Sequence, residues 1–175
     1  LINQAVDEDD ALSYQFAANS FADADSGDSC TYTAALTSGA ALSTLSDSWL
    51  SFNAGSRTFS GTPLNGAVGT ASVRVTCTDG SSAAVTDDFD IVVSNTNDAP
   101  TSAAVTVAST EDTLKTFAAS NFAFTDVDSG SSISRIQITI LESTGDLECN
   151  NKNGGSNGWE DCVANDYVAA GTDLR

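Results

Sequence analysis

The hexapeptide Asn95-Thr96-Asn97-Asp98-Ala99-Pro100 lies between two copies of one sequence pattern. Upstream, Glu8-Asp9 precedes the loop Asp23-Ala24-Asp25-Ser26-Gly27, and downstream Glu111-Asp112 precedes Asp126-Val127-Asp128-Ser129-Gly130. Glu8 and Glu111 are 103 residues apart, and so are Asp23 and Asp126. A repeat of this length indicates one module written twice, with the hexapeptide as the joint between domains 1–96 and 97–175. Because position 175 corresponds to position 72 of the first copy, we expect the second domain to be incomplete at its C-terminus.

The chain is strongly acidic, with 24 Asp and Glu against 6 Lys and Arg, no His and a net charge of −18. Such a surface repels nucleic acid and anionic membranes, so neither is an expected partner. There is no apolar run long enough to cross a membrane, and we expect no membrane insertion. Acids gathered at the repeat joints suggest cation binding; the alternative is a solvated acidic surface that serves only solubility.

Alternating apolar residues predict strands throughout the chain and no useful helix. The clearest strands are expected at 29–36, 70–78 and 83–94 in the first domain, and at 105–107 and 133–140 in the second. The acidic run 7–10 interrupts the first strand where a chain would change from one sheet to the other. The predicted fold class is all-β: tandem immunoglobulin-like Greek-key sandwiches, the second one incomplete.

The four cysteines are an even number, as disulfide pairing requires. Cys30 and Cys77 flank Trp49, which is the order found in immunoglobulin-type sandwiches, where a bridge joins the two sheets. Cys149 and Cys162 bracket a loop rich in Gly and Asn, and a bridge there would stabilise the fold by about 3 kcal/mol. Two bridges imply an oxidising, extracellular setting. Buried free thiols are the alternative, and a stronger one for the 30/77 pair.

Oxygen-bearing side chains at the joint and in the two Asp-x-Asp-Ser-Gly loops have the chemistry of a calcium site. Calcium takes six to eight oxygen ligands, chiefly carboxylates and carbonyls. Asp-x-Asp can aim both carboxylates at one point, while Ser-Gly allows a tight turn behind them. Asn97 and Asp98 add an amide and a carboxylate oxygen, and Pro100 stiffens the exit from the joint.

The chain resembles tandem cadherin-like modules of the dystroglycan and bacterial-adhesin type. The resemblance rests on the repeat elements above and on 49–52, 57–63 and 78–80; it covers nearly all of domain one and domain two through about 141. It implies calcium between consecutive modules, with Glu8, Asn97, Asp98, Asp126 and Asp128 as ligands. Asp23, Asp25 and Asp79 would form the equivalent surface facing a preceding module, and Glu111 would face a following one.

Two departures from the classical cadherin pattern predict that the joint binds fewer calcium ions than a classical cadherin joint. We expect one ion. The joint is one residue shorter than Asp-x-Asn-Asp-Asn-x-Pro and begins with Asn95. Where classical cadherins carry Leu-Asp-Arg-Glu, this chain has Leu64-Asn65-Gly66-Ala67, which lacks the carboxylates.

The resemblance and the composition favour a non-catalytic, extracellular adhesion or structural segment that calcium stiffens at the joint. An enzyme is not expected, because the chain has no His and neither a Gly-x-Ser-x-Gly nor a phosphate-binding loop. One alternative is a carbohydrate-binding module, with Trp159 as the candidate ligand contact. Another is a filament subunit in which a neighbouring chain supplies the missing strand. Expected partners are neighbouring modules, further copies of the chain or cell-surface glycans.

Overall fold

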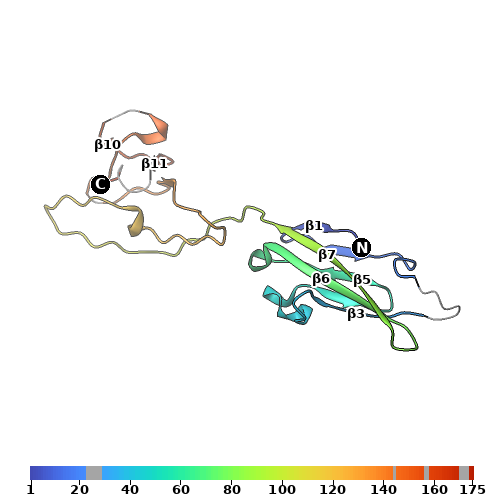
Figure 1. The fold of residues 1–175 in the computed structure, drawn as a ribbon. Coiled ribbons are helices and arrows are strands. Elements are labelled where there is room, and N and C mark those ends of the chain that lie inside the picture. Colours follow the sequence, from blue (N-terminus) through green and yellow to red (C-terminus); the bar gives the residue numbers. More distant parts are fainter. Residues whose placement is uncertain (23–28, 144, 156–157, 170–173) are drawn as a thin grey trace. The chain divides into compact units, whose positions relative to one another are not determined.

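The computed structural model describes residues 1–175 except 23–28, 144, 156–157 and 170–173. The chain divides into two compact units, Leu1–Asn97 (unit 1) and Asp98–Arg175 (unit 2), as Figure 1 shows in its colours. The division lies one residue after the boundary expected from the repeat. Each unit is described by itself below.

Unit 1 is built from two sheets. The four-stranded sheet has the order β1-β7-β6-β3, with β1 at Gln4–Asp7, β7 at Ala84–Ser94, β6 at Gly69–Thr78 and β3 at Thr31–Leu36. The three-stranded sheet has the order β2-β5-β4, with β2 at Leu12–Gln15, β5 at Thr58–Gly61 and β4 at Ser51–Asn53. β1 runs parallel to β7, and the other strand pairs are antiparallel. The predicted change of sheet is confirmed, because the acidic run separates β1 from β2.

Alternation along β6 and β7 decides which side chains enter the core of unit 1. Val73 and Val75 on β6 are fully buried, and so is Ile91 on β7. Arg74 and Val92, their neighbours along the strands, are exposed. From the other sheet, Phe59 packs its ring 4.5 Å from that of Phe52 and 5.3 Å from that of Phe89. Each such fully buried side chain stabilises the fold by about 1.5–3 kcal/mol.

Trp49 belongs to this core, with 8% of its surface exposed. The chain of β5 passes so close to it that only glycine fits at position 61. A Cβ atom added to Gly61 would lie 1.8 Å from the Trp49 carbonyl oxygen, and the φ angle of Gly61 is +156°. The close approach fixes β5 against the segment that leads into β4.

The Cys30–Cys77 disulfide forms, but the expectation that it joins the two sheets is wrong. Cys77 lies on β6 directly opposite Tyr32 of β3, and Cys30 immediately precedes β3. Cys77 therefore lies in the same sheet as the strand that Cys30 leads into, and the two Cα atoms are 5.2 Å apart. The bridge fastens the start of β3 to β6, because these two strands are hydrogen-bonded neighbours.

Unit 2 has only short strands among its described residues. β8 (Arg135–Gln137) pairs antiparallel with β11 (Tyr167–Ala169), and β9 (Glu148–Cys149) pairs antiparallel with β10 (Glu160–Asp161). The strand predicted at 105–107 does not form, and the one predicted at 133–140 is reduced to β8. Beyond β8, Ile138 is buried but Ile140 is 86% exposed. A strand needs a hydrogen-bonding neighbour, and no described segment pairs with 105–107 or with residues 139–140.

The described helices are single 3₁₀ turns, at Leu42–Thr44, Ser46–Ser48, Asn65–Ala67, Ala119–Asn121 and Lys152–Gly154. In the part of the chain that the structure describes, no helix has the length and hydropathy needed to cross a membrane.

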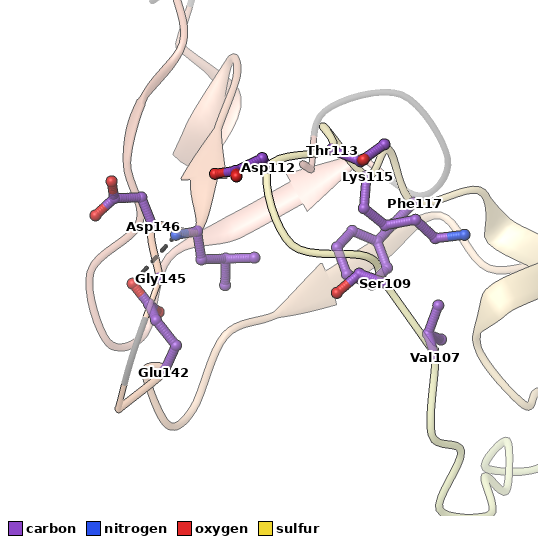
Figure 2. Close-up of a pocket in the computed structure, with 10 residues that line it drawn as sticks. Val107, Ser109, Asp112, Thr113, Lys115, Phe117, Glu142, Gly145 and Asp146 are labelled. Carbon is purple, nitrogen blue, oxygen red and sulfur yellow. Dashed lines mark hydrogen bonds between the residues drawn. The ribbon is translucent and has the colours of Figure 1, made fainter.

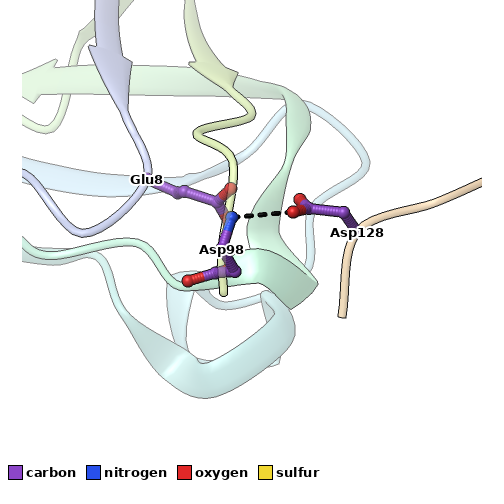
Figure 3. A group of neighbouring side chains, drawn as sticks. All are labelled: Glu8, Asp98 and Asp128. Carbon is purple, nitrogen blue, oxygen red and sulfur yellow. Dashed lines mark hydrogen bonds between the residues drawn. The ribbon is translucent and has the colours of Figure 1, made fainter. Parts of the chain in front are cut away.

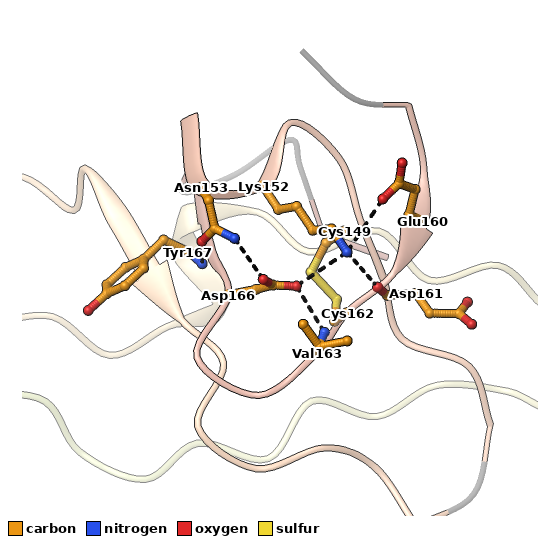
Figure 4. Close-up of polar contacts among 9 residues, drawn as sticks. All are labelled: Cys149, Lys152, Asn153, Glu160, Asp161, Cys162, Val163, Asp166 and Tyr167. Carbon is orange, nitrogen blue, oxygen red and sulfur yellow. Dashed lines mark hydrogen bonds and ion pairs between the residues drawn. A yellow bond between two sulfur atoms is a disulfide. The ribbon is translucent and has the colours of Figure 1, made fainter. Parts of the chain in front are cut away.

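The predicted Cys149–Cys162 bridge is confirmed and closes the Gly- and Asn-rich loop of unit 2 (Figure 4). Beside it, the carboxylate of Asp166 is 3% exposed and accepts hydrogen bonds from Val163 N at 2.9 Å and from Asn153 Nδ2 at 2.8 Å. Lys152 Nζ lies 3.5 Å from the same carboxylate. The hydrogen bond from Val163, helped by Asn153 and Lys152, lowers the pKa of Asp166 against the opposing effect of burial. The loop is thus held by an ionised carboxylate as well as by its disulfide.

Candidate metal centre

Glu8 is a buried carboxylate at the end of β1, and unit 1 satisfies only one of its two oxygens. Its backbone N–H donates to Ser94 O at 2.9 Å, which continues the parallel pairing of β1 with β7. Its side chain is 2% exposed, and Oε1 accepts a hydrogen bond from Thr96 N at 2.7 Å. Oε2 is also buried and has no hydrogen-bond partner among the described residues. Figure 3 shows the side chain leaving the end of β1.

An ionised carboxylate oxygen that is buried without a partner is costly, by about 1–3 kcal/mol or more for a charged group. A divalent cation would satisfy this oxygen and neutralise its charge. Glu8 is therefore a residue whose surroundings fit a metal ligand. The contact with Thr96 also fixes Glu8 close to the joint, since Thr96 is two residues before Asp98 in the chain.

In unit 2, the Asp-x-Asp loop folds back onto the joint. Asp98 N donates to Asp128 Oδ2 at 2.7 Å, the contact drawn as a dashed line in Figure 3. Asp128 N donates in turn to Asp126 Oδ1 at 2.9 Å, so one oxygen of Asp126 shapes the loop. A pair of backbone hydrogen bonds between Thr101 and Thr125, at 2.7 and 2.9 Å, fixes this arrangement just beyond the joint. The predicted ligands Asp98, Asp126 and Asp128 are thus brought together within unit 2.

Glu8 in unit 1, and Asp98 and Asp128 in unit 2, are described carboxylates that could each ligate a metal ion. Glu8 is buried and the two aspartates are half-buried, so their oxygens are partly removed from competing water. Carboxylate oxygens are the ligands that a hard cation such as calcium prefers, together with carbonyl oxygens and water. Asn97, the remaining predicted ligand, precedes Asp98 and is exposed.

The predicted site at the other end of unit 1 is described only in part. Asp23 and Asp25 lie outside the described residues. Asp79 Oδ1 accepts hydrogen bonds from Ser81 N and Ala83 N, both at 2.8 Å, and so shapes the turn between β6 and β7. Glu111, the counterpart of Glu8 in the repeat, is exposed.

Trp159 is half-buried, and the guanidinium of Arg175 covers its ring. The Arg175 Cζ atom lies 4.1 Å from the ring centroid, and Arg175 Nε donates to Glu148 Oε2 at 2.6 Å. This cation–π contact holds the ring against the rest of unit 2. A role for Trp159 in ligand contact stays a prediction.

Two features near the candidate sites were not predicted from the sequence. The Thr96 N–H that positions Glu8 is a backbone group and has no signature in a single sequence. Asp166 carries no motif that sets it apart from the other acids, and only its burial distinguishes it.

The comparisons with known proteins identify the family of the chain. Residues 1–94 match the family described as "Putative Ig domain". The chain belongs to this Ig-domain family. A search of curated protein sequences gave no match. The two sheets of unit 1 and its buried Trp49 and Cys77 agree with membership of this Ig family.

The chain is also similar in structure to cadherin domains. Extracellular cadherin domains 3–6 of protocadherin gamma B2 align with 98% of this chain and 37% of their own, at 13% identity and a TM-score of 0.47. Domains 1–5 of the same protein align with 98% of this chain and 31% of their own, at 12% identity and a TM-score of 0.41. An endo-fucoidan hydrolase from glycoside hydrolase family 107 aligns with 55% of this chain, at 19% identity and a TM-score of 0.33. The chain spans 12% of the length of that hydrolase.

Proposed function

We propose that this chain is a non-catalytic, extracellular adhesion or structural segment in which calcium, held by Glu8, Asp98 and Asp128, stiffens the joint between two Ig-like modules. The observation that carries the proposal is Glu8: a buried carboxylate with one oxygen held by Thr96 N and the other without a described partner. When bound, calcium would neutralise the charge of this carboxylate and coordinate the oxygen that has no described partner.

Local contacts support the ligand set. The hydrogen bond from Thr96 N ties Glu8 to the beginning of the joint, and the hydrogen bond from Asp98 N ties Asp128 to its middle. The short stretch 96–98 therefore contacts both carboxylates, each within its own unit. Asn97 and Asp126 stay predicted ligands, as do Asp23, Asp25 and Asp79 for a second site facing a preceding module.

The extracellular assignment rests on the two disulfides, which persist only under oxidising conditions. Neighbouring modules of the same kind are the expected partners, because the proposed ion stiffens a joint between modules. The net charge of −18 would oppose non-specific association of the chain with other acidic molecules.

Small-angle scattering of the whole chain, with calcium and with EDTA, tests the stiffening directly. We expect calcium to narrow the distribution of end-to-end distances, and magnesium to do so less because it demands a smaller octahedral site. Asp128→Asn should abolish the calcium effect. Asp161→Asn, which changes an exposed carboxylate of the same unit, is the matched control and should retain it. A distribution that calcium leaves unchanged in the unsubstituted chain would refute the proposal.

A further inference from the structure

Unit 2 contains a hollow that is separate from the candidate metal residues. Its volume is about 630 Å³, within the range of small-molecule sites in proteins. Residues from two parts of the sequence line it: one part lies within 107–117, and the other consists of residues 142 and 145–147 (Figure 2). Neither segment contains a strand in the described structure, so the walls are loops whose side chains are not committed to a sheet.

The lining combines an apolar surface with many hydrogen-bonding oxygens. In Figure 2, the ring of Phe117 and the hydroxyl of Ser109 lie on the right and the residues Glu142 and Asp146 on the left, while Asp112 lies at the top, on the same loop as Ser109. Thr113 adds a second hydroxyl. Hydroxyls both donate and accept hydrogen bonds, while carboxylates accept them strongly.

Several contacts hold these walls in place without any ligand. Phe117 N donates to Leu174 O at 3.0 Å, and its ring lies 6.1 Å from that of Phe122. Glu142 Oε1 accepts a hydrogen bond from Leu147 N at 3.1 Å, which closes the second wall. Asp112 has a φ angle of +56°, a left-handed conformation that Asp and Asn tolerate best among residues with side chains. The hollow is therefore largely pre-formed.

We propose that this hollow binds a neutral saccharide. A sugar presents an apolar face, which suits Phe117, together with hydroxyl groups that donate to carboxylates and exchange hydrogen bonds with Ser109 and Thr113. Three lining carboxylates outnumber the single ammonium of Lys115, and the chain has a net charge of −18, so uronate and sulfated glycans are repelled. Trp159 is the less suitable platform, because Arg175 already covers its ring. The proposal concerns unit 2 alone and does not depend on calcium at the joint.

Binding is tested on the whole chain by calorimetry and saturation-transfer NMR. The probes are neutral tetrasaccharides of glucose, mannose, galactose and xylose, with tetragalacturonate and spermidine as charged comparisons. Asp112→Asn keeps the left-handed backbone and removes one carboxylate, and Thr113→Val removes one hydroxyl at nearly constant volume. The matched control is Asp9→Asn in unit 1, the counterpart of Asp112 in the repeat, with a φ angle of +65°.

We expect at least one neutral tetrasaccharide to bind at millimolar concentration or below, equally with calcium and with EDTA. Asp112→Asn should weaken binding about tenfold or more, and Asp9→Asn should not change it. Failure of every neutral saccharide to bind would overturn the proposal, as would preferential binding of spermidine or tetragalacturonate. A loss of binding in Trp159→Phe with none in Asp112→Asn would move the site to the disulfide loop and would also overturn it. If the chain binds sugar but calcium does not change its end-to-end distances, the result would refute only the proposed calcium site at the joint.

Discussion

Replacing Glu8 by Gln separates its structural role from its proposed role as a ligand. The amide keeps the side-chain volume and an oxygen that can accept the hydrogen bond from Thr96 N, but it removes the charge. In EDTA, the unsubstituted carboxylate carries a buried oxygen without a described partner, a burden of about 1–3 kcal/mol. We therefore expect Glu8→Gln in EDTA to be at least as stable as the unsubstituted chain.

Calcium should reverse this order. At a hundredfold excess over Kd, a single bound ion stabilises the folded chain by about 2.7 kcal/mol. For a domain of this size, that corresponds to an increase in Tm of about 10–20 °C. Glu8→Gln should lose most of this increase, since it removes the most deeply buried ligand.

Differential scanning calorimetry in EDTA and in calcium measures both quantities. Glu111→Gln is the control, because Glu111 occupies the same place in the repeat but is exposed. Glu111→Gln should have the same Tm in EDTA as the unsubstituted chain and the same increase in Tm with calcium. An equal calcium-dependent increase in Tm for Glu8→Gln and for the unsubstituted chain would refute the assignment of Glu8 as a ligand.

Further substitutions test the packing and the loop of unit 2. Gly61→Ala should cost more than about 3 kcal/mol in chemical denaturation, because its Cβ would strike a backbone carbonyl; Gly39→Ala, with φ at +88° and open space around it, should cost only about 1 kcal/mol. The lowered pKa of Asp166 stabilises the fold above its unfolded pKa near 4, and this contribution is lost as the pH falls through the folded value; Asp166→Asn should flatten the acid limb of the stability curve. Replacing Cys149 and Cys162 together by Ser should lower the stability of unit 2 by about 3 kcal/mol. If strand complementation operates, sedimentation should show concentration-dependent association, and a strictly monomeric chain would exclude it.

Local sequence patterns predicted most of unit 1. The strands expected at 29–36, 70–78 and 83–94 correspond to β3, β6 and β7, because a two-residue alternation is a property of each strand alone. In unit 2, the same reasoning failed at 105–107, where the alternation is present but no described neighbour pairs with it. A sheet requires a partner, and a pattern within one segment does not report whether that partner exists.

For the predicted metal ligands too, the sequence indicated some properties and only the structure showed others. The repeat and the joint indicated Asp98, Asp126 and Asp128, and within unit 2 these do come together through backbone hydrogen bonds. The sequence did not predict that one oxygen of Asp126 shapes the loop, nor that Asp79 shapes a turn. A single sequence identifies which side chains carry oxygen atoms that could bind a metal ion. It does not show which hydrogen bonds those oxygen atoms accept in the fold.

The sequence by itself determined that this is an acidic, all-β chain, and it predicted a duplicated module, two disulfide pairs and oxygen ligands at the joint. Those properties follow from composition, periodicity and spacing, which are read along the chain. Only the tertiary structure decided that the Cys30–Cys77 bridge fastens the start of β3 to β6, that one oxygen of Glu8 is buried without a described partner, and that two loops of unit 2 enclose a hollow. These depend on which distant segments become neighbours, and that choice is made by packing of the whole domain rather than by any one stretch of residues.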